Sequence, residues 1–379
     1  MSTFQIRRFS KPELLRGIAR PHLLAFLRRY AEYFAGQGLT LPEDDTEALN
    51  YPRLSEILLS PDPSTPPELS EALFYVNEIS TAEGFDDLQA AIVEAGLDLV
   101  VDEEVTPADL AIQVWMREPR IIEKVHAEQR FLKARSFVYF KPDLPEVPTW
   151  SPPTEATLVQ LESAMDRWFV KKRRGQYCKV YLYQKSGHIW FLVRHGKPYT
   201  REAVIEAGES AAQFFRPEKF DVLAYNPATG ELRINAETQG ERQLYREEFG
   251  FHLFGEREFF NRTSCFDLEI LRQQGRDALL CTDVEGMEWV TLKSVEIYRG
   301  GPMKESEIRR AEDLFAALES REQAFPHGGR ITKATFQVKF ANSKIPRIVT
   351  VYAGNRAQFK RDGDAEIIEM WLALRGFIV

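Results

Sequence analysis

The residues best suited to chemistry lie in a predicted hairpin near the middle of the chain. Its first strand contains Lys219-Phe220-Asp221-Val222-Leu223-Ala224-Tyr225, and its second begins Glu231-Leu232-Arg233-Ile234-Asn235-Ala236-Glu237-Thr238. Asp221, Glu231 and Glu237 supply carboxylates, and oxygen ligands are what Mg²⁺ prefers in proteins. Two carboxylates holding such an ion, with a basic group beside the attacking water, are the apparatus of metal-dependent hydrolysis.

This layout resembles the restriction-endonuclease-like superfamily, which places an Asp on one strand and a Glu-x-Lys on the next, before a helix. Asp221 matches the first position, and a helix predicted over 240–249 matches the element that follows. The match then departs, because Asn235 stands where Glu is expected and Glu237 where Lys is expected. A shifted register offers Glu231-Leu232-Arg233, but arginine does not give up its proton and is a poor general base.

The resemblance covers roughly thirty residues, and short motifs of this kind also arise by chance. Three interpretations of the hairpin therefore stay open. It is an ordinary amphipathic hairpin with a charged edge, a nuclease-type fold kept for binding, or an active nuclease that uses Mg²⁺ with Asp221 and either Glu231 or Glu237.

A second candidate site is a basic cluster at the end of a helix predicted over 155–170. Its cations are interleaved with Trp168, Phe169 and Tyr177, and they are Arg167, Lys171, Lys172, Arg173, Arg174 and Lys179. Cations contact phosphates of any sequence and exposed rings stack on unpaired bases, so this cluster predicts contact with nucleic acid. The alternative is that positive charge simply favours a helix C-terminus and that the rings belong to a core.

Several common active sites have no counterpart in the sequence. There is no G-x-x-x-x-G-K-[ST] phosphate loop, no G-x-G-x-x-G after a predicted strand, and no H-E-x-x-H among the six histidines. The three cysteines are far apart and lack a C-x-x-C pair, so we expect neither a disulfide framework nor a zinc site. We therefore expect a non-catalytic protein with no cofactor, and Mg²⁺ only in the nuclease alternative.

The net charge of −8 is concentrated in one segment. Between Leu39 and Asp109 there are eighteen acidic residues and one basic residue, Arg53. This segment should repel nucleic acid and attract a basic partner, or else it is a solvated acidic helical surface.

The period of the apolar residues changes along the chain. Helical spacing dominates the first 135 residues or so, and five prolines within 141–153 predict a stiff connector. Alternating patterns then predict hairpins, followed by a final set of elements at 288–298 (strand), 305–320 (helix), 332–340 and 347–352 (strands) and 365–374 (helix). We expect an α+β fold with a helical domain (1–140), a proline-rich linker (141–154), a strand-rich α+β domain (155–280) and a C-terminal α+β domain (281–379).

Nothing in the sequence indicates a membrane segment. No run of 18 apolar residues occurs and the first residues do not resemble a secretory signal, so we expect a cytoplasmic protein. We predict a binding or assembly protein of a bacterial-type system, such as antiviral defence, whose second half contacts nucleic acid or a protein partner. The alternative function is a divergent metal-dependent nuclease, and the oligomeric state stays open.

Overall fold

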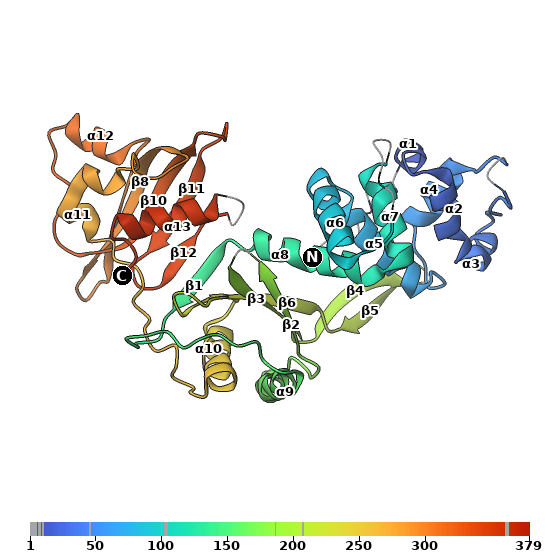
Figure 1. The fold of residues 1–379 in the computed structure, drawn as a ribbon, viewed down its shortest axis with the longest axis horizontal. Coiled ribbons are helices and arrows are strands. Elements are labelled where there is room, and N and C mark those ends of the chain that lie inside the picture. Colours follow the sequence, from blue (N-terminus) through green and yellow to red (C-terminus); the bar gives the residue numbers. More distant parts are fainter. Residues whose placement is uncertain are drawn as a thin grey trace. The chain divides into compact units, whose positions relative to one another are not determined.

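The chain forms two compact units, Met1–Arg130 and Phe131–Val379. The computed structural model describes residues 6, 9, 11–44, 47–99, 101, 105–185, 187–206, 208–360 and 364–379. The fold is α+β, with helices in the N-terminal part and most strands in the C-terminal part, as the sequence predicts (Figure 1). No helix within the described ranges is long and apolar enough to cross a membrane.

The first unit is a set of helices around one apolar core. They are α1 (Pro12–Arg16), α2 (Arg20–Arg28), α3 (Ala31–Gly36), α4 (Tyr51–Leu59), α5 (Pro67–Ile79), α6 (Ala82–Ala95), α7 (Pro107–Arg117) and α8 (Pro119–Lys133), which runs past the end of the unit. Leu24, Leu54 and Val76 are wholly buried there. One acidic residue is also buried: Asp109 accepts from the amide of Ala19 at 2.9 Å, which ties α7 to the start of α2.

The second unit is built on an antiparallel sheet. Its strands in chain order are β1 (Ser136–Phe140), β2 (Lys179–Lys185), β3 (His188–Gly196), β6 (Glu218–Asn226), β7 (Glu231–Asn235), β8 (Met287–Gly300), β9 (Glu305–Arg310), β10 (Arg330–Phe340), β11 (Arg347–Tyr352) and β12 (Arg356–Gln358). Their order in the sheet is β2-β3-β6-β7-β1-β12-β11-β10-β8-β9. A separate two-stranded sheet consists of β4 (Thr200–Glu206) and β5 (Glu209–Phe215).

Helices cover this sheet in two groups. They are α9 (Glu155–Lys171), α10 (Gln239–Phe254), α11 (Ile270–Gln274), a 3-10 helix (Gly275–Leu279), α12 (Leu314–Glu319) and α13 (Ala365–Leu374). Phe169 of α9 and Phe249 of α10 share one core with Phe191 and Leu223 of the strands. In the C-terminal part, the Trp371 ring of α13 contacts Phe336 of β10, with ring centroids 5.3 Å apart.

Strand β1 joins the two parts of the sheet, which differs from the expected domain plan. The sequence analysis assigns residues up to 140 to the helical domain, yet Ser136–Phe140 is a strand that pairs with β7 on one side and β12 on the other. Aromatic residues at alternate positions explain this, because Phe137 and Tyr139 are both buried. The proline run 141–154 and position 280 therefore both fall inside the second compact unit rather than between units.

Two further segments differ from the sequence prediction. The helix expected over 305–320 is strand β9 followed by the short helix α12. Strand β9 is held as the last strand of the sheet by pairing with β8, and Glu307 bonds to Arg299 on that neighbour, so tertiary contacts override local helical spacing. The hairpin formed by β4 and β5 had no prediction, because its large apolar residues stand in adjacent pairs, Val204-Ile205 and Phe214-Phe215, rather than at alternate positions.

Candidate functional site

Asp221 lies in a buried polar network beneath helix α10. Its side chain is 2 % exposed, and Tyr245 donates a hydrogen bond to its Oδ2 at 2.7 Å. His195 Nε2 lies 3.0 Å from the same oxygen, and Lys219 Nζ lies 3.2 Å from Oδ1. The strand register produces this grouping, because β3 and β6 place His195 opposite Lys219, two residues before Asp221. Both oxygens of this carboxylate therefore have partners within the protein.

Glu241 is the second carboxylate of the network and lies in the first turn of helix α10. It forms a capping box with Thr238, whose amide donates to Glu241 Oε2 at 2.7 Å. Lys219 Nζ lies 2.6 Å from Glu241 Oε1, and Arg174 binds the same oxygen. Two cations thus neutralise two carboxylates, and the network ties the end of α9 and the start of α10 to the sheet.

The charges in this network shift each other's pKa. Burial alone would raise the pKa of Glu241, but hydrogen bonds from Lys219 and from the Thr238 amide outweigh it and lower the pKa to about 2. Burial alone would lower the pKa of Lys219, but the charge of Asp221 and the bond to Glu241 outweigh it and raise that pKa. Both groups are therefore charged at neutral pH.

The same network contains a cluster of possible metal ligands. One atom each of His195, Asp221 and Glu241 lies within 4.8 Å of the others. However, these oxygens already accept from Lys219 and Arg174, so a divalent cation would add charge beside two largely buried cations. The donor set does not fit a metal unless both cations leave. Its geometry is that of an internal ion network.

The sequence analysis gives Glu231 or Glu237 as the partner of Asp221. In the structure Glu231 lies far from Asp221, whereas Glu237 lies near it. The register pairs Glu231 with Asn226, at the opposite end of the hairpin, about 17 Å along the strand from Asp221. There Glu231 Oε1 accepts from Arg233 Nε at 2.6 Å. The structure thus does not bring Asp221 and Glu231 together at one site.

Glu237 does lie near Asp221. Its Oε2 is 3.5 Å from Lys219 Nζ, and its side chain is 68 % exposed. Asp221, Glu237 and Lys219 all line one cavity. The hairpin therefore yields one buried and one exposed carboxylate, with a lysine between them.

Part of the basic cluster at the end of α9 forms ion pairs within the protein, and the rest is exposed. Arg167, Lys171, Lys172 and Arg173 are exposed. By contrast, Arg174 turns inward to Glu241, as described above, and Lys179 forms an ion pair with Glu162 at 3.1 Å. The Lys172 ammonium lies over the Trp168 ring, 5.6 Å from its centroid.

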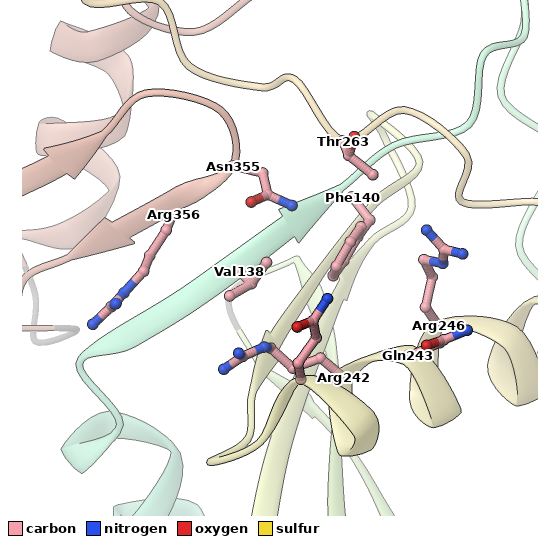
Figure 2. A pocket seen from close by; sticks show the side chains of 9 residues that line it. Val138, Phe140, Arg242, Gln243, Arg246, Thr263, Asn355 and Arg356 are labelled. Atoms are coloured by element: carbon pink, nitrogen blue, oxygen red, sulfur yellow. The ribbon is translucent and has the colours of Figure 1, made fainter. Parts of the chain in front are cut away.

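The second unit also has a concave feature that is lined mostly by residues outside the sequence prediction. It consists of two adjoining cavities, which we call the arginine groove. The first, of about 510 Å³, is lined by Val138, Phe140, Gln239, Arg242, Gln243, Arg246, Thr263, Asn355 and Arg356 (Figure 2). The second, of about 410 Å³, is lined by Ser136, Val138, Lys219, Phe220, Asp221, Ile234, Asn235, Ala236, Glu237, Arg242 and Arg356.

Two arginines line both cavities, and they come from distant parts of the chain. Figure 2 shows Arg242 extending from α10 and Arg356 from β12 on either side of β1. Arg242 donates to the carbonyl of Ala236 at 3.0 Å, and Arg356 Nε donates to Ser136 Oγ at 3.1 Å. Neither guanidinium forms an ion pair with a carboxylate among the residues that the structure describes. Each keeps donors available to a ligand.

A third arginine lies one helical turn along α10. Arg246 Nη2 is 3.6 Å from Glu258, and its Nε is buried without a hydrogen-bond partner in the described part of the chain. Arg242 and Arg246 are four residues apart, so the sequence does place them on one helix face. Nothing local to Arg356 indicates that β12 brings it to the same groove.

Comparison with known proteins adds no further constraint. No protein-family model matches the chain, and no curated protein has significant similarity to it. The site is therefore interpreted from its own geometry.

Proposed function

We propose that the second unit binds nucleic acid in the arginine groove without transforming it. The observation that carries this proposal is the convergence of Arg242 and Arg356 on one groove with no carboxylate partner among the described residues. A guanidinium offers a planar fork of donors that matches a phosphate, and forks without a carboxylate partner in a concave site favour an anionic ligand. The first turn of α10 adds the positive end of a helix dipole.

The exposed cations of α9 extend this surface. The ring of Trp168 lies so close to Gly240, in the first turn of α10, that a Cβ there would be 3.1 Å from it. The end of α9 and the groove therefore both flank that turn. A nucleic-acid backbone crossing the turn would meet Lys171, Lys172 and Arg173 as well as the groove.

A binding assay on the full chain tests this function. We expect single-stranded oligonucleotides to bind, and the Arg242→Gln/Arg356→Gln double variant to lose about tenfold or more in affinity, with a salt dependence shallower by about two charges. Fluorescence anisotropy over a salt series measures both. The matched control is Arg276→Gln/Arg299→Gln, which removes two cations that line neither cavity and bind Glu319 and Glu307.

Three outcomes of this assay would count against the proposal. They are no binding of any oligonucleotide, an equal loss in the control variant, and cleavage in Mg²⁺ or Mn²⁺ that Asp221→Asn abolishes. The last would favour the metal-dependent nuclease, whose support is that Asp221 and Glu237 line one cavity. A protein partner with an acidic segment is the remaining alternative, and a cytoplasmic location would suit each of them.

A further inference from the structure

The two cavities of the arginine groove differ in the chemistry of their walls. The first presents uncharged amides and a hydroxyl from Gln239, Gln243, Thr263 and Asn355, beside the apolar Phe140. Amide and hydroxyl groups both donate and accept, which suits the edges of nucleobases. A cavity of about 510 Å³ holds a small organic group rather than a duplex, so the base must be unpaired.

The second cavity combines one ammonium with two carboxylates. Asp221 and Glu237 line it together with Lys219. Both oxygens of Asp221 already have partners, Oδ2 in Tyr245 and His195 and Oδ1 in Lys219, whereas Glu237 is mostly exposed. Carboxylates repel phosphates and accept hydrogen bonds from hydroxyl groups. This cavity therefore suits a sugar that carries free hydroxyls.

The arginines shared by both cavities determine where the phosphate and the two neighbouring nucleosides of a ligand would lie. Arg242 and Arg356 line both cavities, so a phosphate bound between them would have a nucleoside on each side. One nucleoside would place its base among the amides. The other would place its ribose hydroxyls near Glu237.

We propose that the ligand of the arginine groove is single-stranded RNA, distinguished from DNA by a ribose hydroxyl that donates to Glu237. This inference rests on the proposed nucleic-acid-binding function. A hydrogen bond to a charged acceptor contributes about 1.5–3 kcal/mol, or about ten- to a hundredfold in affinity. DNA would lose this bond and would leave the Glu237 carboxylate without a hydroxyl donor near its phosphates.

The test compares labelled RNA, DNA and 2′-O-methyl RNA of one sequence containing only A and C, so that the sugar alone differs. We expect RNA to bind the full chain at least about tenfold more tightly than either of the others. In Glu237→Ala the affinity for RNA should fall while the affinity for DNA stays level or rises. If Glu237 acted only through its negative charge, its removal would instead strengthen the binding of both RNA and DNA.

Glu218→Ala is the matched control, because Glu218 is an exposed carboxylate on β6 that lines neither cavity. It should change RNA and DNA binding alike. Because Glu237 is mostly exposed, its variant should fold, and the unfolding midpoint checks this. Equal binding of RNA and DNA, or of RNA and 2′-O-methyl RNA, overturns the RNA inference and leaves the proposed function standing. If no oligonucleotide binds, the proposed function itself fails.

Discussion

The carboxylate of Glu241 is wholly buried, and its partners Lys219 and Arg174 are nearly so. Glu241→Gln would therefore leave two cations in the interior with one fewer counter-charge. We expect the free energy of unfolding to fall by about 3–5 kcal/mol, as when one partner of a buried ion pair is removed. Urea unfolding followed by circular dichroism measures this. The control Glu237→Gln alters an exposed carboxylate beside the same lysine and should change stability by less than about 0.5 kcal/mol.

The low pKa of Glu241 also predicts how stability varies with pH. A pKa of about 2 in the folded protein, against an ordinary 4.5, means that folding favours the charged form. Its contribution, about 3 kcal/mol, is fully present above about pH 4.5 and is lost as the pH falls toward 2. The stability difference between wild type and Glu241→Gln should therefore shrink between pH 6 and about pH 2.5. A difference that stays constant over this range would contradict the assignment.

At the scale of single residues, the sequence shows which side chains are suited to chemistry but not which neighbours decide their roles. Asp221 stands out from its motif, but only the folded structure shows that its neighbours are Tyr245 and Lys219. Glu231 fits the motif only in a shifted register, and it lies at the far end of the hairpin, where it bonds to Arg233. Periodicity along one strand gives the face of a side chain but not its neighbours, which come from α10 and from other strands.

Among the elements, hairpin β4–β5 is unusual because it forms a sheet of its own with an open apolar face. Ile205 is 84 % exposed and Phe214 is 66 % exposed, and the register places them on one face of the hairpin. We expect Ile205→Ser/Phe214→Ser to leave the free energy of unfolding within about 0.5 kcal/mol, since folding removes little of their surface from water. Leu223→Ala in β6, at a fully buried position, should cost about 2–5 kcal/mol in the same denaturant titration. A loss above about 1 kcal/mol for the double variant would mean that this face is covered in the intact protein.

Elements with strong local signals are the ones that the sequence predicts. Helix α9, the hairpin of β6 and β7, and helix α13 lie close to their expected bounds, because apolar period and turn residues agree there. Strand β1 was missed since its five residues precede a proline run and gain their stability from β7 and β12, which are distant in sequence. The groove beside β1 is hard to predict for the same reason, because residues distant in sequence line it. Two of its arginines lie on one helix face, but Arg356 reaches it only through the pairing of β12 with β1.

At the scale of the whole molecule, the acidic segment Leu39–Asp109 belongs to the first unit, whereas the arginine groove belongs to the second. Net negative charge slows the approach of a polyanion even where it makes no contact with it, and salt screens the effect. We therefore expect that amides in place of exposed acids in this segment tighten nucleic-acid binding at low salt, by about two- to tenfold. Suitable positions are Glu43, Asp44, Asp62, Glu83 and Glu94, all of them exposed.

The salt series separates this long-range effect from a change in the groove itself. At about 20 mM salt the Debye length exceeds 20 Å, and the gain should appear mainly in the association rate; near 300 mM it should vanish. Adding Arg242→Gln/Arg356→Gln to the amide variant should remove the same factor of affinity as it does in wild type, because sites without shared contacts act additively. A gain that persists at high salt, or that disappears when the groove arginines are lost, would instead mean that the acidic segment and the groove interact directly.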